Sequence, residues 1–312
     1  MKRVQSTTPV FRYVPWMTTI TGTPGNGEAW PVQPRALIVT IYGLYAREAG
    51  GWLSVAWLIR LMAGLGVDEP AVRSSISRLK QRGVLEPGRR GGAAGYALSA
   101  RGRDILAEGD RRIFDRPRAR PADGWLLAVF SVPEPERRRR HALRSRLTWL
   151  GFGTVSAGVW IAPGHLAGET AEVLERGGLS GYVSLFRAEY LAFGDLREQV
   201  GHWWDLDRLQ QLYQAFLDSA GPVLARWDGA GPPGPAGSSG PADGEAFADY
   251  VRALTAWRRL PFLDPGLPAE LLPAAWNGLR ADAAFTVLRQ RLSDPARAHV
   301  LAVTGERPGV SR

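Results

Sequence analysis

The chain of 312 residues contains no cysteine, which excludes disulfide bonds, a thiol nucleophile and thiolate metal sites. Its four histidines show no metal-ligand spacing; they are His141, His165, His202 and His299. A nucleophile elbow, a phosphate-binding glycine loop and the HExxH motif are also missing. We therefore expect no metal ion, no cofactor, no catalytic residues and no enzymatic activity.

Long hydrophobic runs are absent as well. No apolar stretch approaches the roughly 20 residues that span a bilayer. The first residues lack the charged start, apolar core and small-residue cleavage site of a signal peptide. These absences predict a cytoplasmic protein without a membrane partner.

Lysine is rare, occurring only at Lys2 and Lys80, yet arginine gives the chain a net charge of +9. The charge is uneven, because residues 35–112 hold 13 basic and 7 acidic side chains whereas residues 195–312 hold 12 and 14. Neutralisation of phosphates supplies most non-specific affinity for nucleic acid. The N-terminal part is therefore expected to bind a polyanion.

Residues 68–98 have the pattern of a DNA-recognition helix followed by a β-hairpin. Asp68 suits a helix cap, and Val72, Ile76 and Leu79 recur at helical spacing as a buried stripe. Gly83 is expected to end this helix. The stripe leaves outward side chains that bond phosphates or base edges, namely Arg73, Ser74, Ser77, Arg78, Lys80 and Gln81. A solvated amphipathic helix is the alternative.

A basic, glycine-rich turn follows the predicted helix. It lies between strands that begin at Val84 and end at Leu98. Gly88, Gly91 and Gly92 are expected to make it mobile, so that Arg89 and Arg90 contact backbone phosphates without fixed geometry.

Two further helices precede the recognition helix, over residues 34–48 and from a cap at Ser54. The order helix, helix, tight turn, helix and hairpin is typical of a winged helix-turn-helix domain, whose third helix enters the major groove.

The remaining pattern predicts an α+β protein with several parts. We expect a flexible arm over residues 1–33, the winged domain over 34–114 and a linker over 115–124. Residues 125–194 alternate strands and helices as in a ferredoxin-like α/β sandwich, with strands at 125–132, 154–162 and 181–193. Residues 195–312 read as a helical C-terminal domain with helices at 205–217, 245–259 and 280–292, and with a mobile Pro/Gly-rich loop at 228–244.

Three groups of residues resemble the PaaX family of bacterial repressors. The first joins Pro34 and Arg35 to VRSSISRLKQRGVLE at 72–86 and GYALSARGR at 95–103. The second joins WLLAVFSVPE at 125–134 to LRSRLTWLGFGTVSAGVWIAP at 143–163. The third and most specific is WRRLPFLDPGLPAELLPAAWNG at 257–278.

This resemblance implies a homodimeric repressor of aromatic acid (phenylacetate-like) catabolic genes. Such a repressor binds a double-stranded DNA operator and is released by an aryl-acyl-coenzyme A thioester such as phenylacetyl-coenzyme A. An effector-independent DNA-binding or structural dimer is the alternative. A metal nuclease of ferredoxin-like fold is disfavoured, because Phe130, Ser131 and Val132 stand where related CRISPR adaptation nucleases have a metal-binding Asp at the end of the first strand.

An aryl group needs an aromatic slot, and the phosphates of coenzyme A need fixed cations. Candidate effector-binding residues are His202, Trp203, Trp204, Tyr213, Trp257, Arg258 and Arg259; the alternative is an ordinary helical core. We expect effector binding to need the part beyond residue 194 and DNA contact not to need it. The helix from Glu134 holds six arginines (137–140, 144 and 146), which either contact phosphates or form a solvated face.

Overall fold

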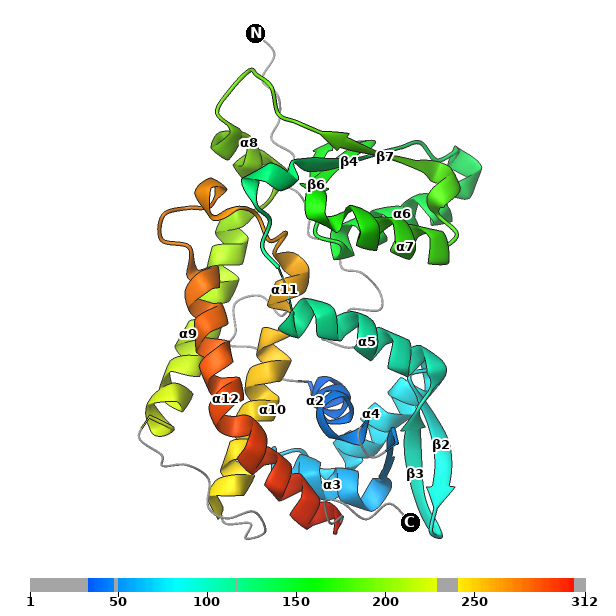
Figure 1. Ribbon diagram of the computed structural model, residues 1–312. Coiled ribbons are helices and arrows are strands. Elements are labelled where there is room, and N and C mark those ends of the chain that lie inside the picture. The colour runs from blue at the N-terminus through cyan, green and yellow to red at the C-terminus, as the bar shows by residue number, and fades with distance from the viewer. Residues whose placement is uncertain (1–32, 48–49, 116, 229–240, 306–312) are drawn as a thin grey trace. The chain divides into compact units, whose positions relative to one another are not determined.

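The computed structural model describes residues 33–47, 50–115, 117–228 and 241–305 (Figure 1). It is an α+β structure with two antiparallel sheets. The described residues fall into two compact units, one within 116–212 and 260–276, the other within 33–115, 213–259 and 277–305. Residues 1–32 of the predicted arm and 229–240 of the predicted loop lie outside the described residues. No helix in the described ranges is both long and apolar enough to cross a membrane.

The N-terminal segment of the second unit builds a three-stranded sheet beside four α-helices. Its strands have the order β1-β3-β2. Its elements are α2 (Pro34–Ile41), a π-helical turn η1 (Tyr42–Ala46), β1 (Trp52–Ser54), α3 (Val55–Ala63), α4 (Glu69–Gln81), β2 (Leu85–Arg90), β3 (Ala93–Leu98) and α5 (Ala100–Phe114). The short strand β1 was not predicted, because three residues carry no periodicity.

The C-terminal helices complete the core of this N-terminal segment. They are α9 (Leu206–Arg226), α10 (Pro241–Trp257) and α12 (Asn277–Thr304), and α10 and α12 pack on each other and on the N-terminal helices (Figure 1). The buried hydroxyls of Thr40 in α2 and Thr255 in α10 are hydrogen bonded at 2.7 Å. The indole of Trp257 stacks on Phe285 of α12, with 4.9 Å between ring centroids, and donates to the Ile113 carbonyl of α5. The N- and C-terminal segments therefore share one hydrophobic core.

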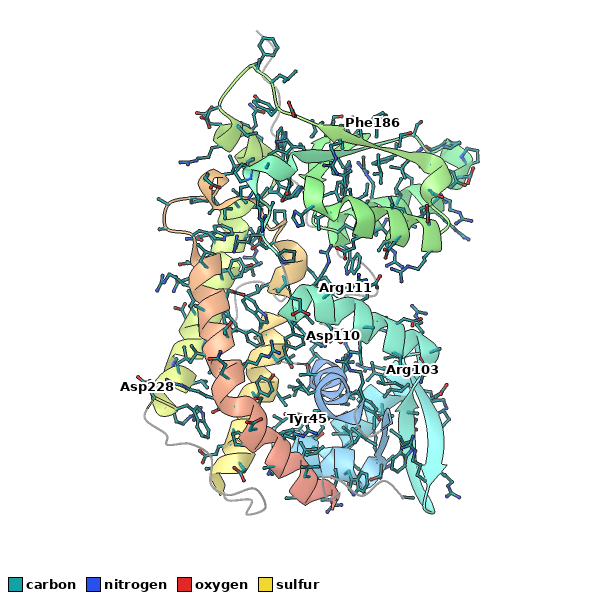
Figure 2. The ribbon with its side chains drawn as sticks, viewed as in Figure 1. Tyr45, Arg103, Asp110, Arg111, Phe186 and Asp228 are labelled. Atoms are coloured by element: carbon teal, nitrogen blue, oxygen red, sulfur yellow. The ribbon has the colours of Figure 1, made fainter. Side chains whose placement is uncertain are left out.

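The other unit holds a four-stranded antiparallel sheet with two main helices on one face (Figure 1). The elements run β4 (Trp125–Phe130), α6 (Arg137–Trp149), β5 (Gly153–Ser156), β6 (Val159–Pro163), α7 (Ala167–Arg176) and β7 (Val183–Ala188), and the strand order is β5-β6-β4-β7. Figure 2 shows Phe186 of β7 on the face away from α6 and α7, where the side chain is 51% exposed. The unit also contains α8 (Leu196–Trp203), α11 (Leu260–Leu263) and the 3-10 turns η2 (Pro121–Asp123), η3 (Glu134–Glu136), η4 (Gly164–Leu166), η5 (Ser180–Tyr182) and η6 (Ala269–Leu271).

Several predicted boundaries were wrong. The strand expected at 154–162 is a hairpin, because Ala157 and Gly158 turn the chain between β5 and β6. The strand expected to reach residue 193 ends at Ala188, and Asp195 caps the unpredicted helix α8. Helix α9 extends to residue 226 through Pro222, and α10 already begins within the last residues of the predicted loop.

Candidate nucleic-acid interface

Helix α4 is placed as its sequence predicts. The Asp68 carboxylate accepts a hydrogen bond from the Ala71 amide at 2.8 Å and so caps the helix. Val72, Ile76 and Leu79 are 0–3% exposed. The buried stripe fixes which side of α4 faces solvent.

The six polar residues that we singled out on α4 are all exposed. They are Arg73, Ser74, Ser77, Arg78, Lys80 and Gln81. Arg73 is held by the neighbouring Glu69, with 2.6 Å between Nη2 and the carboxylate oxygen. Exposed ion pairs at this spacing contribute only about 0.3–0.5 kcal/mol to stability, so little free energy is lost when Arg73 leaves Glu69 to bind another anion.

The hairpin beside α4 is more regular than the sequence predicts. Strand β2 continues through Arg89 and Arg90, and the turn is only Gly91–Gly92, both with positive φ (53° and 80°). Two adjacent residues in this conformation match the tight turn that twisted antiparallel strands prefer. The expectation of a mobile turn beginning at Gly88 was therefore wrong, because Gly88 pairs with Gly95 inside the ladder.

The two arginines of the hairpin differ in their surroundings. Arg90 donates to the Gly50 carbonyl at 2.9 Å, and its guanidinium lies 5.6 Å from the ring centroid of Trp52. Arg89 is exposed. The geometry of Arg90 is thus fixed in the free chain, contrary to the sequence-based expectation, whereas Arg89 presents its charge to solvent.

Two basic residues at the edges of α4 were not singled out from the sequence. Arg82 is the exposed C-terminal cap of α4, and Arg35 stands in the first turn of α2, which packs against α4. Burial lowers the pKa of Arg35, and the charges of Arg82 and Arg78 lower it further. Arg82 was recognisable as the next cation after Lys80. Arg35 was not, because its proximity depends on how α2 packs on α4.

The candidate effector residues are divided between the two compact units. In one unit Trp203 and Trp204 cluster with Trp125, and the Trp204 indole donates to the Gly151 carbonyl at 2.9 Å. His202 is exposed on α8.

The other candidates lie in the interior of the second unit. Tyr213 and Trp257 are in contact, with 6.3 Å between ring centroids, and are 1% and 3% exposed. Arg258 and Arg259 are also buried, and Arg258 donates to the Ala36 carbonyl. Burial, together with the charge of Arg259, lowers the pKa of Arg258 to about 9. These side chains connect helices within a hydrophobic core, as expected if they form an ordinary helical core and not an effector site.

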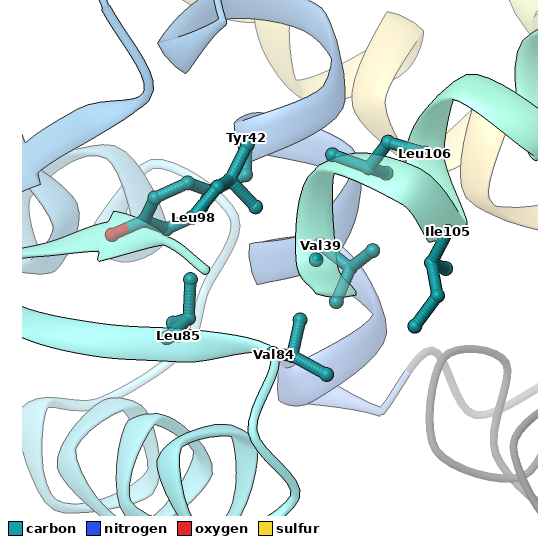
Figure 3. Close-up of a pocket in the computed structure, with 8 residues that line it drawn as sticks. Val39, Tyr42, Val84, Leu85, Leu98, Ile105 and Leu106 are labelled. Carbon is teal, nitrogen blue, oxygen red and sulfur yellow. The ribbon is translucent and has the colours of Figure 1, made fainter. Parts of the chain in front are cut away.

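A small cavity lies between α2, the β2–β3 hairpin and α5 (Figure 3). Its volume is ≈ 10 Å³, and its lining is apolar, including Val39, Leu98 and Leu106. A space of that size holds about one water molecule, which would also need polar partners. The cavity is therefore a small packing void in the hydrophobic core, and it is far too small for an acyl-coenzyme A.

The arginine-rich helix α6 presents most of its charges to solvent. Arg137, Arg138, Arg139 and Arg144 are exposed, whereas Arg140 is bonded to Glu134 and to the Val132 carbonyl. Both interpretations of this helix therefore stay open. Within the described residues there is no group of three or more side chains arranged to hold a metal ion.

Three family models match successive parts of the chain. A "PaaX-like protein" model matches residues 33–102, the "PaaX protein central Cas2-like domain" matches 118–200, and the "PaaX-like protein C-terminal domain" matches 204–302.

Two individual proteins are similar over most of the length. The transcriptional repressor PaaX of Escherichia coli is 28% identical over 276 residues, which are 88% of this chain and 84% of that protein. A solved structure of an uncharacterized protein, Rv0674 from Mycobacterium tuberculosis, is 24% identical with a TM-score of 0.54, covering 86% of this chain and 98% of that one. The matched segments include α4, its hairpin and the C-terminal helices α10 and α12, and the chain belongs to the PaaX family.

Proposed function

We propose that this protein is a DNA-binding transcriptional repressor and not an enzyme. The observation that carries the proposal is the exposed polar face of α4, held by a buried stripe beside a basic hairpin. The similarity to the E. coli repressor supports the same function. We interpret residues 34–114 as a winged helix-turn-helix domain and the β4–β7 sheet with α6 and α7 as a ferredoxin-like sandwich.

In this proposal α4 is the recognition helix and enters the major groove of a double-stranded operator. Arg73 and Arg78 are long enough to reach guanine, Gln81 suits adenine, and Ser74, Ser77 and Lys80 contact phosphates or base edges. Arg89 contacts the backbone. Arg90 contributes less to DNA contact in this proposal, because its guanidinium is bonded to the Gly50 carbonyl and lies over the ring of Trp52.

The finer parts of the proposal come from the family. They are a homodimer, control of aromatic acid catabolic genes and release by an aryl-acyl-coenzyme A. The burial of Tyr213, Trp257 and Arg258 gives these residues a packing role, so an effector site would require their rearrangement. An effector-independent DNA-binding dimer is the second candidate, favoured by the interior contacts of these same residues.

Selection of bound sequences from a random duplex library tests the proposed function. The full chain should enrich a defined motif. Arg78→Ala should weaken binding to that motif by about 1–3 kcal/mol and relax the preference at one base pair. Arg101→Gln, an exposed arginine on α5, serves as the matched control and should bind as the wild type does.

Failure to enrich any motif would overturn the proposal. Wild-type affinity and preference in both Arg73→Ala and Arg78→Ala would remove α4 from the interface. Thermal shift against a series of aryl-acyl-coenzyme A compounds separates the two candidates, since a ligand that binds only the folded state raises the melting temperature.

A further inference from the structure

Three arginines from two helices lie close together at one end of α4. Arg35 belongs to the first turn of α2, Arg78 to the last turn of α4, and Arg82 follows as the C-terminal cap. The packing of α2 on α4 brings them together, and the pKa of Arg35 is lowered by burial and by the charges of the other two. The three positive guanidinium groups therefore repel one another when no anion is bound.

No neutralising partner for these three guanidinium groups is found among the described residues. Other arginines of the same unit are paired, as Arg47 is with Asp110 and Arg226 with Asp249. Arg35 is different: its Nε is buried and makes no hydrogen bond. The start of α2 adds to the positive field, because Gln33 gives no side-chain cap to the first amides.

We propose that Arg35 and Arg82, with the positive charge of Arg78 beside them, form a phosphate-binding site. Guanidinium groups bind phosphate oxygens through paired, charge-assisted hydrogen bonds, and the buried Nε of Arg35 is a donor that such an oxygen would satisfy. The site binds a phosphate whether or not α4 reads bases, and so it goes beyond the proposed function. The phosphate belongs either to the backbone of duplex DNA or to a small phosphorylated molecule.

The double variant Arg35→Gln/Arg82→Gln tests the site while leaving Arg78 for other contacts. Arg101→Gln/Arg111→Gln is the matched control, because both arginines are exposed on α5 and the loss of charge is the same (Arg111 is labelled in Figure 2). One arm measures binding of a short random-sequence duplex at several salt concentrations. The other measures the melting temperature with and without inorganic pyrophosphate.

If the site holds DNA backbone, the test variant should reduce the slope of log affinity against log salt by about 2, with the control unchanged. If it holds a small phosphorylated molecule, pyrophosphate should raise the melting temperature of the wild type and the control but not of the test variant. Without any ligand, the test variant should melt no lower than the wild type, because two repelling charges are gone. Either binding result supports the site and identifies the source of the phosphate.

Wild-type behaviour of the test variant in both arms would overturn the proposal. A lower melting temperature with both binding arms unchanged would also overturn it, since the arginines would then be structural. Failure of the proposed function gives a different result. The wild type would then enrich no sequence motif, whereas the salt dependence of duplex binding and the melting temperature with pyrophosphate could still be measured.

Discussion

Gly95 illustrates how a single residue sets the position of the hairpin beside α4. A Cβ at Gly95 would overlap the Leu53 carbonyl oxygen and the ring of Trp52, whereas one at its ladder partner Gly88 would lie 3.5 Å from that ring. Gly95→Ala should therefore lower the free energy of unfolding by about 1–3 kcal/mol, a usual cost of overpacking. Urea denaturation measures it, with Gly88→Ala as the control. Equal stability of the two variants would contradict the close approach of Trp52.

His299 gives a second prediction at this scale, on pH dependence. Its ring lies 5.2 Å from that of Phe247, and burial lowers its pKa, partly opposed by Asp243. The pKa of His299 in the folded chain is below the unfolded value of about 6.5, so the unfolded chain binds more protons in the pH range between the two values. The stability of the fold that depends on a neutral His299 is therefore lost as the pH falls from about 6.5 towards the folded pKa. Between pH 7.5 and 5.5 the melting temperature of the wild type should fall more than that of His299→Gln. Identical decreases would exclude this histidine as the source.

At the scale of elements, the contact between α2 and α10 links the first and last parts of the chain. The hydroxyls of Thr40 and Thr255 lie 2.7 Å apart and either can be the donor, because each also lies within hydrogen-bond distance of a carbonyl four residues earlier. A double-mutant cycle of Thr40→Val and Thr255→Val should give a coupling energy of about 1 kcal/mol in denaturant unfolding. Pairing Thr40→Val with Thr304→Val, whose hydroxyl bonds carbonyls of its own helix α12, should give additive effects. A coupling near zero in the first cycle would mean that the two helices do not meet through this bond.

Local signals in the sequence predicted most helices but not their partners. The caps Asp68 and Ser54 and the stripe on α4 are properties of neighbouring residues, and each is confirmed. The division of residues 154–162 into two strands depends on one turn of small residues, which periodicity does not resolve. The proximity of Arg35 to the charges of Arg78 and Arg82 depends on tertiary packing over more than 40 residues of sequence, and the hydrogen bond of Arg258 to α2 over more than 200. No local pattern predicts either of them.

At the scale of the whole molecule, α10 and α12 belong to the same compact unit as the segment proposed to bind DNA. Carbonyls of Ala36, Leu65 and Ile113 accept hydrogen bonds from Arg258, Arg252 and Trp257. The sequence alone predicts that DNA contact does not need the residues beyond 194. The shared core predicts the opposite.

A chain ending at residue 115 should accordingly fail to fold cooperatively, because the side of α2 that α10 buries would be exposed to solvent. Circular dichroism during heating should show a broad, non-cooperative transition, in contrast to the full chain. The full-length Thr255→Val variant is the control for a small loss of contact. A sharp melting transition in the fragment, with duplex binding equal to that of the full chain, would show that the N-terminal segment is independent.

The central claim is that α4 meets DNA, and site-directed photocrosslinking tests it most directly. A benzophenone-bearing residue is placed at Ser77 on the exposed face of α4, and in separate chains at Arg101 on α5 and at Arg138 on α6. With the duplex enriched from the random library, irradiation should crosslink the DNA at Ser77, within the enriched motif, and not at Arg101. Crosslinking at Arg138 but not at Ser77 would contradict the account and transfer the interface to the arginine-rich helix.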